Sequence, residues 1–151
     1  MKQIIIKKGT LKDIDGLVSL LKQLFSIEKA FTFNPHAHKR GLRLFLNDCG
    51  SHRVLYTAWA GHRIVGMVSA QTRISTASGT MAAVIEDLVV DSTCRGRGVG
   101  SQLLDSVEQW AKTSGICHLS LLADMENHPA LKFYAVNGWE QTQMRMLKKV
   151  L

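Results

Sequence analysis

The sequence predicts one α/β (α+β) domain, built as a mixed, mostly antiparallel sheet with helices on both faces. The chain has 151 residues, the length of a single domain, and shows no repeat, linker or change of composition. Its middle part is rich in the Val, Ile, Thr and aromatic residues that favour strands, whereas helical spacing of apolar residues marks segments on either side. We therefore expect one domain over residues 1–151, with the element order β-α-α-β-β-β-α-β-α-β.

The first part of the chain is expected to form a strand and two helices. A short apolar run predicts a strand over residues 3–7. A capping-box pattern that begins at Thr10 then opens an amphipathic helix, whose apolar residues recur at helical spacing over 11–25. Asn34-Pro35 places an N-cap before a proline at the first helical position, which predicts a second helix over 35–46.

The rest of the chain predicts strands first and then alternation of helix and strand. Two β-type runs separated by a Gly-His turn read as a hairpin, and a third run follows another turn. Three antiparallel strands followed by a β-α-β unit give the mixed sheet. The expected elements are strands over 53–60, 63–75 and 81–90, a helix over 99–113, a strand over 116–122, a helix over 129–136 and a strand over 144–151.

Charge and cysteine content limit the classes of function. The formal net charge is +7, which attracts acidic partners such as nucleic acid, anionic lipid or phosphorylated small molecules without choosing among them. Cys49, Cys94 and Cys117 are odd in number and form no C-x-x-C pair, so we expect reduced thiols and no zinc ribbon. The apolar N-terminal run is too short for a signal peptide, and no run of eighteen apolar residues occurs. We expect a cytoplasmic protein without a membrane partner.

The glycine-rich segment over 95–101 carries the clearest chemical signal. It joins a predicted strand to a predicted helix, so its glycines can bring backbone amides close to an anion at the positive end of that helix. Arg95 and Arg97 add positive charge. Neither the P-loop pattern nor the dinucleotide pattern G-x-G-x-x-G occurs here. From the glycines alone, a phosphate or pyrophosphate site and a solvated turn are equally favoured.

Two motifs resemble the signatures of the GNAT-type N-acetyltransferases. The residues Arg95-x-x-Gly98-x-Gly100 resemble the acetyl-CoA signature Gln/Arg-x-x-Gly-x-Gly/Ala of that family. The segment over 127–139 resembles its second signature, Asn-x-x-Ala-x-x-Phe/Leu-Tyr-x-x-x-Gly-Phe/Trp. The expected element order also agrees with that of the family, and the resemblance covers nearly the whole chain. It implies a GNAT-like fold and direct transfer of an acetyl group from acetyl-CoA to a primary amine in a ternary complex, without a metal.

The resemblance also implies which residues bind acetyl-CoA. The loop amides would hold the CoA pyrophosphate, and the backbone at the end of the preceding strand would pair with the pantetheine arm. An amide near Val90 would polarise the thioester carbonyl, and Asn127 would contact the pantetheine or adenosine part. The cofactor-binding residues expected on this basis are Leu88, Val89, Val90, Arg95, Gly96, Arg97, Gly98, Val99, Gly100, Ser101 and Asn127.

Two side chains are expected to move protons. By the resemblance, Tyr134 protonates the departing CoA thiolate, which a phenol with a pKa near 10 can do as that thiolate forms. The amine must lose a proton before it attacks, and Glu86 and Asp87 are the nearest carboxylates in sequence. Strand alternation puts these two on opposite faces. We expect Glu86 to be the base because it shares a face with Leu88 and Val90, although a surface salt bridge explains Glu86 equally well.

The acceptor is left open by the sequence. Glu28 could pair with a cationic amine while Phe31 flanks its apolar part, although core packing is the better explanation of the aromatic residue. A small amine, a polyamine, an aminoglycoside, an amino acid and a protein amino group all remain candidates. The alternative function is a CoA-binding regulatory module on the same fold without efficient catalysis. No nucleic-acid partner is expected, because no nucleic-acid motif occurs. A homodimer through edge strands or helices is compatible with the sequence.

Overall fold

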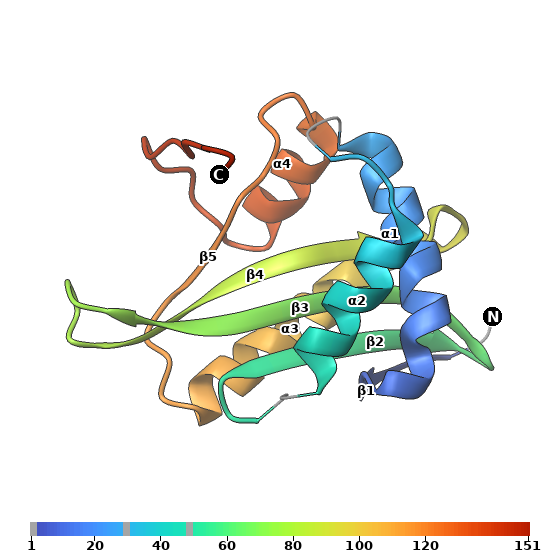
Figure 1. Cartoon of the computed structure of the whole chain (residues 1–151). Helices are drawn as coiled ribbons and strands as arrows, with labels where there is room; N and C mark the ends of the chain where they lie inside the picture. Colours follow the sequence, from blue (N-terminus) through green and yellow to red (C-terminus); the bar gives the residue numbers. More distant parts are fainter. Residues whose placement is uncertain (1–2, 29–30, 48–49) are drawn as a thin grey trace. The chain divides into compact units, whose positions relative to one another are not determined.

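The computed structural model describes residues 3–28, 31–47 and 50–151 (Figure 1). The chain divides into two compact units after Ser120. Cys94 is a buried free thiol and Cys117 an exposed one, whereas Cys49 lies outside the described residues.

The first unit is built on a five-stranded sheet in the order β1-β2-β3-β4-β5. Its strands are β1 (Ile4–Lys8), β2 (Arg53–Ala60), β3 (Arg63–Ser75), β4 (Thr80–Val90) and β5 (Leu119–Leu121). The pairs β1–β2, β2–β3 and β3–β4 are antiparallel, which confirms the expected mostly antiparallel sheet. The first four strands agree with the sequence prediction to within one residue at each end.

β5 is shorter than the strand expected over 116–122. The N–H of Ile116 donates to the carbonyl of Ala111 at 2.9 Å, so this residue still completes the end of the preceding helix. At the other end, the side chain of Leu122 is 67% exposed, unlike the partly buried side chains of β5. Within these limits only Leu119–Leu121 form a regular strand, although the Cys117 N–H still donates to the Met81 carbonyl of β4 at 3.1 Å.

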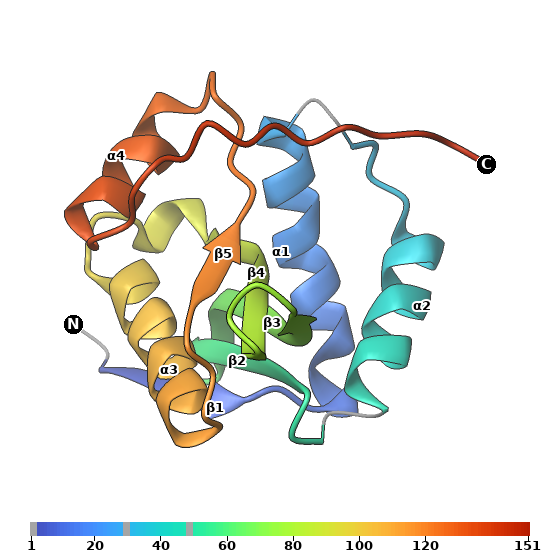
Figure 2. The same ribbon diagram turned by 90° about the vertical axis from the view of Figure 1, so that its left-hand side faces the viewer.

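Helices cover both faces of this sheet, as predicted (Figure 2). A single 3-10 turn, η1 (Leu11–Asp13), leads into α1 (Ile14–Ile27), which lies with α2 (Pro35–Leu46) on one face, while α3 (Val99–Thr113) lies on the other. The predicted caps are present: the Thr10 N–H donates to Asp13 Oδ2 at 2.7 Å, and Asn34 Oδ1 accepts from the Ala37 N–H at 3.1 Å. Among the described residues, no helix is both long and apolar enough to cross a membrane.

The core of the first unit has two layers, one on each face of the sheet. On the α1 face, Leu17 and Leu20 pack with Met67 and Val89 of the sheet. On the α3 face, four apolar side chains of the helix are at most 1% exposed, those of Val99, Leu103, Leu104 and Val107. Removing this apolar surface from water is the main force that fixes α1 and α3 against the sheet.

The second unit contains one helix, α4 (His128–Val136). Asn127 caps it, because its Oδ1 accepts from the Ala130 N–H at 3.2 Å. The strand expected over 144–151 is wrong, since these residues form neither strand nor helix. A strand needs a backbone partner and a surface for its alternate side chains. Here Met144 and Leu147 are 88% and 94% exposed, and two consecutive lysines break the alternation.

Candidate functional site

A β-bulge interrupts β4 close to its C-terminal end. Two residues of β4, Asp87 and Leu88, stand opposite a single residue of β3, Val68. Asp87 has a φ of 51°, in the left-handed region that Asp adopts more readily than most residues. A bulge of this kind adds one residue to one strand, so it shifts the alternation of side chains beyond it.

The bulge overturns the face assigned to Glu86. Strict alternation predicts that Glu86 shares a face with Leu88 and Val90. In the sheet, Glu86 pairs with Ser69, and Val89 pairs with the residue two before Ser69, so Glu86 and Val89 share a face. The expectation was wrong because the extra residue reverses the alternation after Glu86, a feature that depends on strand pairing.

Three carboxylates act on one another at this bulge. Burial raises the pKa of the Asp87 carboxyl to about 6, and the negative charges of Glu86 and Glu28 add to the rise. Glu86 is exposed on β4, and Glu28 follows the last residue of α1, where its N–H donates to the Leu24 carbonyl at 3.0 Å. The fold therefore brings Glu28 and the carboxylates of β4 into one electrostatic environment, although Glu28 and Glu86 are 58 positions apart in the sequence.

Aromatic residues gather between α1 and α2. The ring of Phe31 lies 5.5 Å from that of Phe25, and the His38 ring lies 4.8 Å from Phe25 and 5.2 Å from Phe33. His38 Nε2, within α2, accepts a hydrogen bond from the N–H of the N-cap residue Asn34 at 2.9 Å, which holds the start of this helix in place. Phe33 packs against the core, whereas Phe31 is 50% exposed. Core packing, which the sequence favours for Phe31, therefore describes its neighbour Phe33, whereas Phe31 itself is half-exposed.

The glycine-rich loop runs from the 3-10 turn η2 (Ser92–Cys94) to the start of α3. Gly96 and Gly98 have φ values of 70° and 74°, and a Cβ placed on either would meet no heavy atom within 4 Å. The first bond of α3 runs from the Gln102 N–H to the Gly98 carbonyl at 3.1 Å, so the amides over 99–101 precede it and have no partner within the helix. An open loop with unpaired amides at a helix N-terminus fits a phosphate group.

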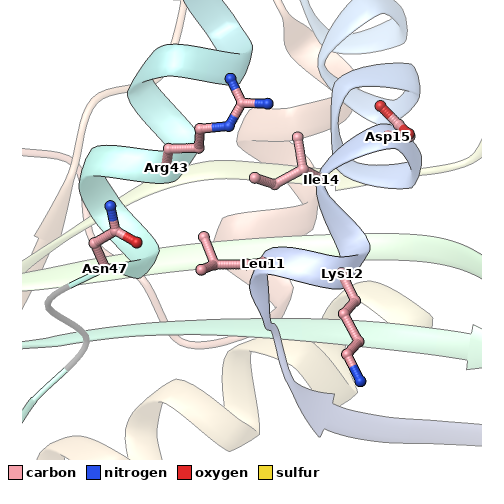
Figure 3. A pocket seen from close by; sticks show the side chains of 6 residues that line it. All are labelled: Leu11, Lys12, Ile14, Asp15, Arg43 and Asn47. Atoms are coloured by element: carbon pink, nitrogen blue, oxygen red, sulfur yellow. The ribbon is translucent and has the colours of Figure 1, made fainter.

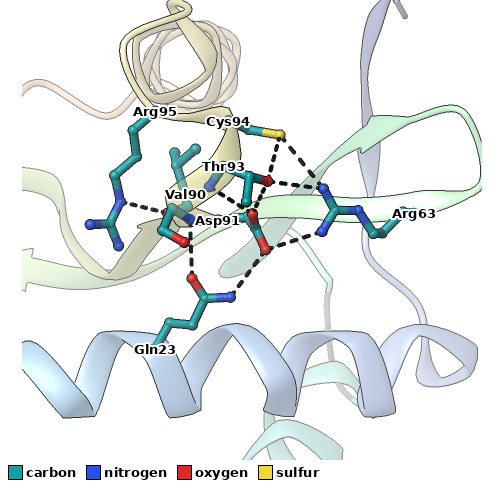
Figure 4. Close-up of polar contacts among 8 residues, drawn as sticks. Gln23, Arg63, Val90, Asp91, Thr93, Cys94 and Arg95 are labelled. Atoms are coloured by element: carbon teal, nitrogen blue, oxygen red, sulfur yellow. Dashed lines mark hydrogen bonds and ion pairs between the residues drawn. The ribbon is translucent and has the colours of Figure 1, made fainter.

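The two loop arginines differ in what they contact. Arg95 Nε donates to the carbonyl of Val90 at 3.0 Å, linking the loop to the last residue of β4 (Figure 4). Arg97 is exposed. Val99 has a buried side chain, so only its backbone amide can serve a ligand. Both arginine residues are exposed, so the loop carries positive charge at the protein surface, as the sequence predicts.

The entry to the loop is held by a polar cluster that sequence reasoning missed (Figure 4). The Asp91 carboxylate, in a residue only 8% exposed, accepts hydrogen bonds from the Thr93 amide at 3.0 Å and from Gln23 Nε2 at 3.1 Å. Arg63 Nη1 lies 3.3 Å from the same carboxylate. These contacts, led by the hydrogen bond from the Thr93 hydroxyl, hold the pKa of Asp91 below its ordinary value. Nothing in the local sequence pairs Gln23 with Asp91.

The remaining predicted residues lie at the end of β4 and in the second unit. Leu88 and Val90 are partly buried, and Val89 is buried in the core. In the second unit, Tyr134 is partly buried on α4, with its ring 6.1 Å from that of Trp139, and Asn127 caps the same helix. The two residues of the second signature therefore share one short helix and its cap.

A separate hollow of about 250 Å³ lies beside η1, α1 and α2 (Figure 3). At its rim, Asp15 forms an ion pair with Lys39 at 2.8 Å. None of its lining residues belongs to the predicted site, so it does not bear on the predicted chemistry. The lining residues are Leu11, Lys12, Ile14, Asp15, Arg43 and Asn47.

Comparisons with known proteins found a matching protein family, similar sequences and similar solved structures. The model of the acetyltransferase (GNAT) family matches residues 21–139. An aminoalkylphosphonate N-acetyltransferase of Salmonella typhimurium is 27% identical, over 95% of this chain and 89% of its own length. A transcriptional regulator from Bacillus halodurans superposes with a TM-score of 0.85 at 27% identity, over 99% of this chain and 100% of the other. An aminoglycoside N-acetyltransferase solved with CoA gives a TM-score of 0.83 at 21% identity, over 99% and 96% of the two chains.

Proposed function

The chain belongs to the acetyltransferase (GNAT) family and is an acetyl-CoA-dependent acyltransferase, and we propose that it acetylates a primary amine by direct transfer in a ternary complex. The observation that carries the proposal is the loop before α3. Its glycines at positive φ leave open space, and the amides at the start of the helix have no helical partner. This arrangement supports an anion site at the position where the family signature puts acetyl-CoA.

The cofactor contacts follow from this arrangement. We assign the pyrophosphate to the amides over 96–101, with Arg95 and Arg97 supplying positive charge at the rim. Backbone groups of Leu88–Val90 would extend along the pantetheine arm, next to the loop that begins immediately after β4. An amide near Val90 would donate to the thioester oxygen as negative charge develops there. Asn127, in the second unit, is assigned to the cofactor by the family signature alone.

A carboxylate of β4 is proposed to remove the proton from the amine. Because of the bulge, Glu86 does not share the face of Val90 that the sequence predicts for it, and its side chain is exposed. Asp87 is the better candidate, because its pKa of about 6 leaves it ionised at neutral pH while keeping it more basic than an ordinary aspartate. Glu86 stays in the proposal as a second carboxylate that favours the protonated form of its neighbour.

Tyr134 is proposed as the acid that protonates the departing CoA thiolate. An ordinary phenol carries its proton at neutral pH and can donate it as the thiolate forms. A packed aromatic residue without a role is the simplest alternative, and the Tyr134 ring does lie near those of Phe133 on α4 and Trp139 after it. The motif around Tyr134 supports the role of acid.

The acceptor amine is proposed to bind between the carboxylates of Glu28, Glu86 and Asp87 and the aromatic ring of Phe31. Glu28, beside the β4 carboxylates, would attract the ammonium group, and the half-exposed ring of Phe31 would cover the apolar part of the molecule. Because the Salmonella relative is named for aminoalkylphosphonates, short aminoalkylphosphonates are the first acceptors to test. Polyamines and aminoglycosides follow as a cationic set.

The test is an acceptor screen that follows thiol release from acetyl-CoA. We expect release that depends on both enzyme and amine, with the acetylated amine identified by mass spectrometry. A second candidate is a CoA-binding regulatory module, which the fold shared with a protein named as a transcriptional regulator favours. Tight binding of acetyl-CoA without thiol release for any amine class would support that candidate instead. Tyr134→Phe and wild type would then also bind acetyl-CoA equally tightly and release equally little thiol.

A further inference from the structure

We propose that Gln23 is a positioning residue for the cofactor loop, because it links helix α1 to the two residues through which the chain leaves β4. The inference rests on the proposed binding of the acetyl-CoA pyrophosphate by the loop amides. Gln23 itself lies outside both family signatures, 68 positions before Asp91.

The amide of Gln23 uses both of its ends on this segment (Figure 4). Its Nε2 donates to Asp91 Oδ2 at 3.1 Å, and its Oε1 accepts from the Ser92 N–H at 3.1 Å. A donor and an acceptor are needed at once, which a carboxamide provides. Leucine provides neither, and an ionised glutamate lacks the donor.

The same segment is held on its other sides by the fold. The Asp91 N–H donates to the Val65 carbonyl of β3 at 2.8 Å, and the Cys94 N–H donates to the Asp91 carbonyl at 2.8 Å. Arg63 of β3 reaches both Asp91 and Thr93 with its guanidinium. Gln23 supplies the contact from α1, so the start of the loop is fixed between β3 and α1.

The position of Ser92 determines where the loop amides lie. Only Thr93 to Arg95 separate it from Gly96, and η2 makes that stretch a tight turn with little freedom to absorb a shift. Ser92 is exposed, so water can satisfy its N–H when Gln23 is replaced. The expected consequence is therefore a displaced anion site in a folded protein, and a smaller effect on stability.

The experiment is a calorimetric titration of acetyl-CoA into wild type, Gln23→Leu and Gln23→Glu, at several pH values. We expect Gln23→Leu to bind roughly tenfold more weakly at every pH, as the loss of two hydrogen bonds implies. Gln23→Glu should bind weakly at pH 8, where its carboxylate faces that of Asp91. Its affinity should recover relative to wild type as the pH falls, because a protonated glutamate donates and accepts as glutamine does. Arg63, also in contact with Asp91, is charged throughout this range.

Matched controls separate positioning from a general effect of substitution. The same two changes at Gln109, an exposed residue on α3, should leave the affinity within about twofold of wild type. If wild type binds acetyl-CoA and Gln23→Leu binds it equally well, Gln23 is not a positioning residue. If Gln23→Leu does not fold, Gln23→Glu decides, and a pH dependence parallel to that of wild type overturns the inference. Failure of wild type itself to bind would refute the proposed function instead.

Discussion

Gly98→Ala separates the cost of a backbone conformation from the loss of an anion site. Gly98 has a φ of 74°, and a Cβ there meets no heavy atom within 4 Å. In the protein alone the new methyl group therefore clashes with nothing, and the cost is that of holding alanine in the left-handed region, roughly 1–2 kcal/mol. For a domain of this size, such a loss lowers the melting temperature by about 2–8 °C.

Gly79 offers a matched control at the opposite end of β4. It has a φ of 67°, and a Cβ there also meets no heavy atom within 4 Å. Gly79→Ala should therefore lower the melting temperature by a similar amount. At roughly 3.3 Å per residue, the length of β4 keeps Gly79 on the order of 30 Å from the loop. Only Gly98→Ala places a methyl group where a phosphate must approach the amides, so only this variant should lose acetyl-CoA affinity, by about tenfold or more.

The assay pairs thermal unfolding with calorimetric titration of acetyl-CoA for the two variants and wild type. The expected result is equal destabilisation with unequal binding. Unchanged acetyl-CoA affinity in folded Gly98→Ala would refute the assignment of the loop. Equal loss of affinity in Gly79→Ala would show that destabilisation, and not a blocked anion site at Gly98, lowers the affinity for acetyl-CoA.

Further predictions concern the groups proposed to move protons. Tyr134→Phe should lower kcat while sparing acetyl-CoA affinity, and equal turnover across the pH range would remove Tyr134 from the mechanism. We expect kcat/KM of the wild type to rise through about pH 6; Asp87→Asn should abolish this rise, whereas Glu86→Gln should keep it. The reverse result would return the role of base to Glu86. The raised pKa of Asp87 means that the fold favours its protonated form, so wild-type stability falls as pH rises through about 6. Asp87→Asn should consequently be more stable than wild type at pH 8, by about 1–3 kcal/mol, and equal to it below about pH 4 in denaturant unfolding. A stability difference that does not change with pH would contradict the burial of that charge.

Local signals predicted most of the fold correctly. Asn34-Pro35 opens α2 because a cap and a fixed φ act within one turn, and Gly98 precedes α3 because that position needs a positive φ. The strand expected over 144–151 failed because a strand also depends on a partner, which the run of residues cannot reveal. Sequence periodicity alone could not distinguish a paired strand from an exposed tail.

The site was predicted less completely, for the same physical reason. The glycine-rich loop lies between a strand and a helix, as the sequence predicts, because that signal is local. The bulge at Asp87 arises from the register between β3 and β4, so alternation along β4 gave Glu86 the wrong face. The contact between Gln23 and Asp91 joins residues 68 positions apart, and only the packing of α1 on the sheet brings them together.

The most direct test of the central claim is a calorimetric titration of the wild-type protein with acetyl-CoA, with CoA and ATP as comparators. ATP carries phosphates and adenine but lacks the pantetheine arm that β4 is proposed to bind. We expect acetyl-CoA to bind much more tightly than ATP. Equal binding of acetyl-CoA and ATP, or no binding of either, would contradict the assignment of the loop and of β4 to acetyl-CoA.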